Sequence, residues 1–270
     1  MRGVSRASLA DAKERLAALV PRTSSASELA GELFAVADVL DSQPAVRRAL
    51  ADPASARSAR TGLAQALFGA RVGPDTIELV SSVASAQWSE SADLADAIEQ
   101  MAVEAIVAEA DRAGRLDDLE DDLFRFGRLV GSQAELRAAL SNPFAPANVK
   151  QDLVTALLGD KVIPQTIQLV TQAALHPRGR SLDRSLEEYA RLAAEYRERL
   201  VAEVRVASEL SAAQRSRLAA TLARAYGHKV HLNIVLDPGV IGGMVIRIRG
   251  EQIDGSVATR LAEIRRRLTT

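Results

Sequence analysis

The sequence contains no cysteine, which excludes thiol catalysis, disulfides and thiolate metal sites. Aromatic residues make up only 3%, with Trp88 the single tryptophan, so the chain can scarcely supply the platforms on which nucleic-acid-binding modules stack bases. No apolar run approaches the ~18 residues that a membrane span needs, and the N-terminus lacks the continuous apolar stretch of a signal peptide. We therefore expect no nucleic-acid partner, and membrane association only through protein partners.

The composition that remains is ordinary. The 270 residues carry a net charge of −1, with 47% hydrophobic and 26% charged residues. This balance is typical of a soluble globular protein and gives no general attraction toward nucleic acid or anionic lipid. The length allows one large domain or two modest ones.

No arrangement of residues predicts an active site. His176, His228 and His231 lack metal-ligand spacing, and no nucleophile motif such as G-x-S-x-G is present. One acidic cluster lacks the spacing and turn glycine of a calcium loop, so we interpret it as the solvated start of a helix: Asp117, Asp118, Glu120, Asp121 and Asp122. The basic stretch "HPRGR" (176–180) is expected to be a solvent-exposed loop. We predict no catalytic residue, no metal and no cofactor.

An internal duplication dominates the first three quarters of the chain. A shift of ninety residues aligns residues 33–80 with residues 123–170 without a gap, and 18 of the 48 positions are identical. The matches include Ser42/Ser132, Gln43/Gln133, Pro53/Pro143, Gly69/Gly159 and Pro74/Pro164. Unrelated sequences would share only a few positions, so the two stretches are copies of one helical unit.

Each copy has the start and stop signals of helices. In the first copy, Leu63, Ala66 and Leu67 are predicted to form one face of a helix that ends at Gly69 in a left-handed cap, and Pro74 opens the next helix. The same signals recur ninety residues later.

The last helix of each copy carries an apolar stripe that we predict to be core, with a peptide-binding groove as the alternative for some positions. The stripes are Leu94, Ile98, Met101 and Ala105, and Leu182, Leu186, Tyr189 and Ala193. The helix at 94–112 could close the first bundle and open the second, so separate and interleaved packing both stay open.

From about Val201, apolar and polar residues alternate as in strands, and one helix is predicted between the first two of them. Val230, Leu232, Ile234 and Leu236 are predicted to share one face of a strand, and Met244, Ile246 and Ile248 one face of another. Ser211 and Gln214 form a capping-box pattern at the start of the helix between the first two strands, with Leu218 and Leu222 on its apolar face and Gly227 at its end. A short strand "EQI" and a final helix, with Ser256 as its N-cap, complete this part.

These patterns predict a mainly α protein, with a duplicated N-terminal helical bundle followed by a small C-terminal α/β module. The predicted domains are a first helical bundle repeat at 1–113, a second repeat at 114–200, and the α/β module at 201–270.

The glycine-rich stretch "LDPGVIGGMVIRIRG" (236–250) invites a phosphate-binding interpretation, which its context contradicts. Gly239, Gly242 and Gly243 precede a strand, whereas a dinucleotide fingerprint opens a helix, and no Gly-Lys-Ser/Thr triplet exists for a P-loop. We interpret Asp237-Pro238-Gly239 as a turn, and the paired glycines as a bulge or a close backbone approach.

This stretch, followed by "QIDGSVATRLAEIRRRL" (252–268), resembles the C-terminal signature of the delta subunit of F-type ATP synthase, called the oligomycin-sensitivity-conferring protein in mitochondria. The matching residues, which we regard as structural, are Asp237, Pro238, Gly242, Gly243, Asp254, Gly255, Ser256 and Leu261. Residues 115–268 resemble the family well, and residues 1–114 do so through the duplication. The basic residues Arg260, Arg265 and Arg266 are either a solvated face or candidate contacts to an acidic partner.

The resemblance implies a non-catalytic stator subunit of the proton-translocating ATP synthase, peripheral at the cytoplasmic face of a bacterial cell membrane. In this family the helical bundle binds the N-terminal helix of an alpha subunit at the top of the catalytic head, and the C-terminal module meets the C-terminal end of the b-subunit stalk. Together these contacts stop the head from turning with the rotor, so that proton flow drives ATP synthesis.

The extra helical copy departs from the family, because the usual delta subunit has a single bundle. Which copy receives the alpha helix is open. The alternative function is a helical-repeat scaffold of another assembly that binds partner helices through the same grooves.

Overall fold

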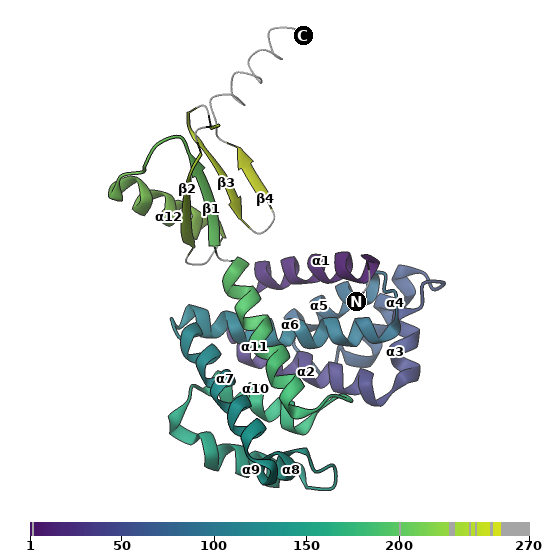
Figure 1. The fold of residues 1–270 in the computed structure, drawn as a ribbon. Coiled ribbons are helices and arrows are strands. Elements are labelled where there is room, and N and C mark those ends of the chain that lie inside the picture. The colour runs from purple at the N-terminus through teal and green to yellow at the C-terminus, as the bar shows by residue number, and fades with distance from the viewer. Residues whose placement is uncertain are drawn as a thin grey trace. The chain divides into compact units, whose positions relative to one another are not determined.

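The computed structural model describes residues 1, 3–199, 201–226, 230–237, 239–240, 242–248 and 251–254. Contacts within the chain divide it into two compact units, Met1–Ala194 and Glu195–Thr270. In the residues that the structure describes, the first unit is built of helices and the second contains a four-stranded sheet and helix α12 (Ala212–Tyr226) (Figure 1). The predicted fold class, mainly α with a small C-terminal α/β module, is confirmed.

The helical unit contains both copies of the duplication. The helices before the second copy are α1 (Gly3–Leu19), α2 (Ala26–Ser42), α3 (Pro44–Ala51), α4 (Arg57–Phe68), α5 (Pro74–Ser85) and α6 (Ser91–Arg112). The second copy continues with α7 (Leu116–Ser132), α8 (Ala134–Ser141), α9 (Ala147–Leu158), the short 3₁₀ helix η1 (Gly159–Lys161), α10 (Pro164–Leu175) and α11 (Leu182–Arg199). Asp117 and Asp118 lie in the first turn of α7, as predicted.

Helix α6 belongs to both copies. Fifteen of its 22 residues are buried, so it has no broad solvent face, and it packs against α1, α2, α3 and α5 as well as α7 and α10. Helix α6 precedes α7 as α1 precedes α2, so it takes the place of α1 one repeat later. Thus α6 closes the first bundle and also serves as the first helix of the second, and the two copies interleave.

The predicted apolar stripes of α6 and α11 are both buried, with every one of their eight residues below 4% exposed. The stripe predicted for α4 was wrong. Its buried residues are Arg60, Ala64 and Phe68. The Arg60 guanidinium points inward and donates to main-chain carbonyls, so the buried face of α4 is the one that carries this arginine. Gly69 was also wrong as a left-handed cap, since its φ is −58°.

Helices α5 and α10 are capped at both ends by side chains from elsewhere in their own copy. Pro74 and Pro164 open them, as predicted. The Glu32 carboxylate accepts hydrogen bonds from the Gly73 amide at 2.9 Å and from Thr76, and Asp122 accepts one from Thr166 in the second copy. At the other end Arg60 donates to the carbonyls of Ser85 and Ala86, and the ammonium of Lys150 donates to the Ala174 carbonyl at 3.1 Å. Acid at the N-terminus and base at the C-terminus also suit the helix dipole.

The second unit is an open sheet in the order β2-β1-β3-β4. Its elements are β1 (Val201–Val206), α12 (Ala212–Tyr226), β2 (His231–Leu236), β3 (Met244–Ile248) and β4 (Glu251–Asp254). Strands β1 and β2 are parallel and are joined through α12, whereas β3 pairs antiparallel with β1 and β4. Figure 1 shows α12 against one face of this sheet.

The core of the second unit lies between α12 and the sheet. It is formed by Ala202, Val204, Val206, Leu222, Val230, Ile246 and Ile248. The predicted capping box is confirmed, because Ser211 and Gln214 each accept a hydrogen bond from the other's amide. Leu236 departs from the predicted strand face, with 54% of its surface exposed at the end of β2. Gly227 and the predicted final helix lie outside the described residues.

Candidate docking surfaces

The described part of the chain offers several candidate docking surfaces. Within it, no group of three or more histidine, aspartate or glutamate side chains is placed to hold a metal ion. No helix there combines the length and the apolar character needed to cross a membrane. His176 pairs with Asp38, His228 lies outside the described residues, and His231 begins β2.

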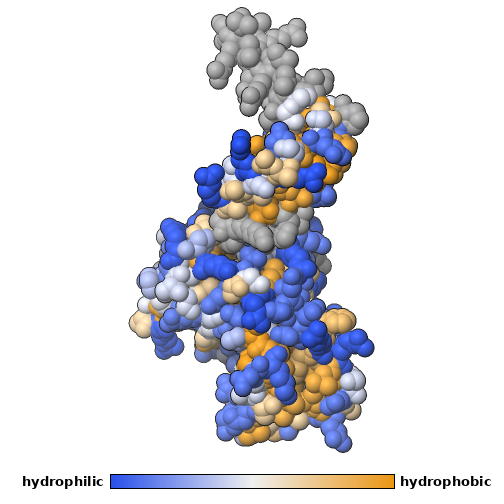
Figure 2. All heavy atoms as spheres, turned by 90° about the vertical axis from the view of Figure 1, so that its left-hand side faces the viewer, coloured by the Kyte–Doolittle hydropathy of each residue, from blue (hydrophilic) through white to orange (hydrophobic). Residues whose placement is uncertain are grey.

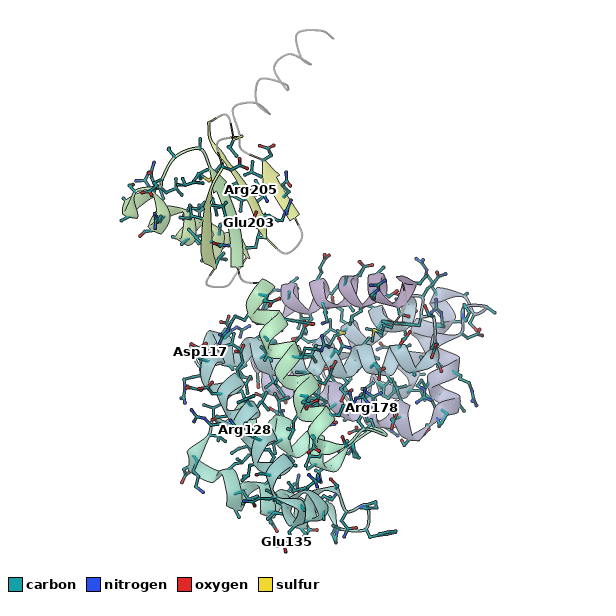
Figure 3. All side chains as sticks on the ribbon, in the orientation of Figure 1. Asp117, Arg128, Glu135, Arg178, Glu203 and Arg205 are labelled. Carbon is teal, nitrogen blue, oxygen red and sulfur yellow. The ribbon has the colours of Figure 1, made fainter. Side chains whose placement is uncertain are left out.

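In the loop 176–180, Pro177 and Gly179 are exposed, but the Arg178 side chain is buried between the two copies, so the predicted solvent exposure was wrong for that arginine. The Arg178 side chain is only 6% exposed, and its guanidinium reaches Glu99 at 2.5 Å and Asp96 at 3.0 Å, both on α6. Arg180 also pairs with Glu99, and the Tyr189 hydroxyl donates to that carboxylate at 2.9 Å. Figure 3 labels Arg178 at this junction.

The electrostatics keep this junction charged. Burial by itself would lower the pKa of Arg178, but the carboxylates of Glu99, Asp96 and Asp41 outweigh it and raise that pKa. Burial, followed by the Glu99 carboxylate, raises the pKa of Tyr189 well above its usual value. The tyrosine therefore stays a hydrogen-bond donor and the arginine a cation, and together they hold the Glu99 carboxylate.

A hollow of 420 Å³ opens in the second copy where α8, α9 and α10 meet, lined by residues that include Leu140, Pro143, Lys150, Ala174 and Leu182. In the first copy the single tryptophan, Trp88, lies beside Ala51 and Pro53, the equivalents of Ser141 and Pro143. Its indole N–H donates to the Val83 carbonyl at 2.9 Å, and it is 6% exposed. Because Trp88 is the single tryptophan of the chain, the second copy has no indole for the position beside Ser141 and Pro143.

One face of the second copy receives a helix of the first. On α10, the Gln168 side chain donates to the Ser27 carbonyl at 3.0 Å and the Gln172 side chain to Asp38 at 3.4 Å, and both acceptors belong to α2. Phe34 of α2 packs on Tyr189 with ring centroids 6.5 Å apart. Helix α2 therefore lies over α6 and α10.

The equivalent face of the first copy, along α1 and α5, is more open. The counterparts of Gln168 and Gln172 are Glu78, which is exposed, and Ser82, whose hydroxyl donates to the Leu79 carbonyl of its own helix. Helix α1 packs mainly on α5 and α6, and it exposes 53% of Val4. The first copy thus offers the face on which the second copy already holds a helix.

In the second unit, Asp237 forms the predicted turn. Its side chain accepts a hydrogen bond from the Gly239 amide at 2.8 Å, and its carbonyl accepts one from the Val240 amide at 3.1 Å. Gly242 and Gly243 have φ values of 66° and 79°, a left-handed conformation that favours glycine. Asp254 ends β4 opposite Val245. A signature role for these residues stays a prediction.

The turn packs near a polar part of the sheet. Arg205 on β1 pairs with Glu203 at 2.7 Å and approaches the Asp237 carboxylate at 3.9 Å (Figure 3). The remaining predicted site residues lie outside the described residues: Pro238, Gly255, Ser256, Arg260, Leu261, Arg265 and Arg266.

The comparisons with known proteins cover the whole chain. The family model described as ATP synthase delta (OSCP) subunit matches residues 98–268, from within α6 to the end of the second unit. "ATP synthase subunit delta" of Streptomyces griseus subsp. griseus is 46% identical over 99% of both chains, and that of Thermobifida fusca is 47% identical over 99% of both. The Acidothermus cellulolyticus protein of the same name is 44% identical over 100% of both.

A chain in the solved mitochondrial ATP synthase hexamer of Toxoplasma gondii has 20% identity and a TM-score of 0.29, over 62% of this chain and 95% of that one. The family model begins in α6, whereas the relatives extend through the first copy as well. The first copy is therefore shared by whole relatives although it lies almost entirely outside the family model.

Proposed function

Because the chain belongs to the ATP synthase delta (OSCP) subunit family, we propose that it acts as a non-catalytic stator. In this role it links the catalytic head to the b-subunit stalk, so that proton-driven rotation yields ATP. The observation that carries the proposal is the match to ATP synthase delta subunits along the full length of both chains. The complex would hold this subunit peripherally, on the cytoplasmic face of the cell membrane.

The helical unit is the proposed receiver of the alpha-subunit N-terminal helix. The second copy already has α2 laid over α6 and α10, which occupies the face that the first copy leaves open along α1 and α5. An amphipathic helix in a groove buries an apolar stripe and needs an open face of this kind. We therefore assign the alpha helix to the α1–α5 face of the first copy.

The C-terminal module is the proposed contact for the b-subunit stalk. The signature residues would act as its scaffold, because Asp237, Gly242 and Gly243 fix the turn that leads into β3. The basic residues Arg260, Arg265 and Arg266 are retained as proposed contacts to acidic groups of the stalk.

Calorimetric titration of the full chain with a peptide from the alpha-subunit N-terminus tests the first contact. Ser82→Arg places a long cation on the α1–α5 face, where the native hydroxyl bonds only within its own helix. We expect saturable binding by the unaltered chain and a loss of at least about tenfold in affinity for Ser82→Arg. Ser58→Arg on the exposed side of α4 is the matched control and should bind as the unaltered chain does.

The outcomes separate the possibilities. Normal binding by Ser82→Arg would move the alpha helix to another face. If the unaltered chain neither binds the peptide nor co-purifies with ATP synthase subunits, the stator proposal fails and the helical-repeat scaffold becomes the leading account.

A further inference from the structure

The outer face of α7 repeats a surface that the chain already uses for packing. The ninety-residue shift places Phe124 of α7 over Phe34 of α2. Phe34 is 3% exposed, and its ring packs on that of Tyr189 in the second copy. Phe124 is 62% exposed. The same phenylalanine position is thus buried on α2 and exposed on α7.

Other apolar side chains of the second copy are open on its surface. Phe144, in the loop between α8 and α9, is 92% exposed, and Val149 at the start of α9 is 51% exposed. The first copy has alanine at both positions, Ala54 and Ala59. Figure 2 shows apolar residues gathered in the lower part of the helical unit, which the second copy forms. At these two positions, therefore, a large exposed apolar side chain belongs only to the copy that carries α7.

Residues beside Phe124 leave room for a close neighbour. Gly127 and Gly131 fall three and seven residues after Phe124, on the same side of the helix. A Cβ atom added to either would meet nothing within 4 Å outside its own turns of helix. Glycine inside a helix costs about 0.5–1 kcal/mol relative to alanine. The packing of the chain itself gives no reason for that cost, whereas a docked helix would.

The charge on α7 selects the partner. On α2, Asp38 and Asp41 face the basic loop of the second copy, through His176 and Arg178. Their counterparts on α7 are Arg128 and Gly131, so one acidic residue is replaced by a cation and the other by a residue without charge. The basic loop that pairs with the acidic residues of α2 would find no acidic partner at these two positions of α7.

The cations on this edge are accessible. The Arg128 guanidinium lies 5.8 Å from the centroid of the Phe124 ring, which it steadies by a cation–π contact. Arg125 pairs with Asp121 at 3.4 Å, and both side chains are more than 70% exposed, so this pair contributes little and opens at little cost. Figure 3 labels Arg128 on α7. A carboxylate-bearing partner would gain charge-assisted hydrogen bonds from both arginines.

We propose that the outer face of α7, formed by Phe124, Gly127, Arg128 and Gly131 with Arg125 at its edge, docks an amphipathic helix of another protein chain. That helix presents aliphatic side chains to Phe124 and carboxylates to Arg125 and Arg128. The inference rests on the proposed function in one respect, namely that the partner is another subunit of the ATP synthase. The contact is separate from the α1–α5 face.

The test uses ATP synthase stripped of this subunit, to which the full chain and its variants are rebound. Phe124→Ala and Arg128→Glu should each weaken rebinding by about tenfold or more, as expected for an apolar anchor and a charge at one docking face. Thermal unfolding should hardly change, because both side chains lie on the surface. Phe144→Ala removes another exposed phenylalanine of the same copy and serves as the matched control, with unchanged rebinding.

A photo-reactive phenylalanine analogue in place of Phe124 identifies the occupant. The expected product is a cross-link to a helical segment that carries aspartate or glutamate beside aliphatic residues. Unchanged rebinding by both variants, or cross-links only to a second copy of this chain, would overturn the inference and leave the proposed function intact. Failure of the unaltered chain to rebind would overturn both.

Discussion

Arg178 lies in a loop and has a backbone φ of 49°, a conformation that side chains other than glycine rarely adopt. Its guanidinium nevertheless lies among Glu99, Asp96 and Asp41 and is almost fully buried. A residue held in such a conformation needs compensating contacts. Here the compensation comes from two elements of the first copy, α2 and α6, so one side chain joins the two copies.

Arg178→Ala should lower the free energy of unfolding by about 3 kcal/mol, since removing one member of a buried ion pair leaves the other charge without its partner. The value lies at the lower end of the usual range because Arg180 and Tyr189 still hold the Glu99 carboxylate. Urea unfolding followed by far-ultraviolet circular dichroism measures the loss. Arg125→Ala, on the surface of α7, should change it by no more than about 0.5 kcal/mol. Equal effects of the two substitutions would refute a structural role for the junction.

The local sequence around Arg178 could not reveal this role. A basic loop facing water and a basic loop buried against carboxylates have the same local pattern, and Glu99 lies 79 residues away in the chain. One signal was available. Glu99 and Glu104 lie among the alanine and aliphatic residues in the middle of α6, and both are buried at 3% exposure, where a carboxylate needs a partner. Lys13 supplies the partner for Glu104 at 2.6 Å.

At the scale of elements, α5 and α10 show how the duplication conserves a function while changing its residues. Arg60 and Lys150 occupy equivalent positions and are 3% and 7% exposed. Arg60 donates to two carbonyls at the end of α5, and Lys150 donates to one at the end of α10. The sequence predicted the helix starts at Pro74 and Pro164 correctly, because proline constrains the backbone locally. The periodicity of apolar residues was less informative. It misassigned the buried face of α4, because a buried arginine does not register in an apolar pattern.

Lys150→Met should destabilise the chain by about 1–3 kcal/mol, because it leaves the buried carbonyl of Ala174 without its donor. Lys150→Arg should stay within about 0.5 kcal/mol of the unaltered protein, since Arg60 already does the same work in the first copy. Chemical unfolding of the three proteins side by side makes the comparison. An equal loss of stability in both variants would mean that the site accepts lysine alone. Capping of the helix by either cationic side chain would then be the wrong explanation.

At the scale of the whole molecule, the duplication could be predicted from the sequence, but the way the two copies pack against each other could not. Identity at 18 of 48 positions establishes two copies, whereas a single helix shared between them is a property of three-dimensional contacts. The predicted boundary between residues 113 and 114 follows the repeat in the sequence. In the structure it falls just after α6, which packs on both copies. The three-part division stays a prediction from the sequence.

The shared helix leads to a prediction about cooperativity. A fragment of residues 1–113 would keep α6 but expose Phe34 and leave Glu99 without Arg178, Arg180 and Tyr189. A fragment of residues 114–270 would lose α6 and with it a packing surface for α7 and α10. Both should unfold at clearly lower urea concentration than residues 1–194, the matched fragment that holds the complete helical unit.

In the full chain, the fluorescence emission of Trp88 reports on the first copy. It should change at the same urea concentration at which the amides of α10, in the second copy, lose their protection from hydrogen exchange. Separate transitions for these two probes would show that the copies are independent domains. A single transition would mean that the two copies unfold together. A partner docked on either copy would then stabilise both, because α6 packs on helices of both copies.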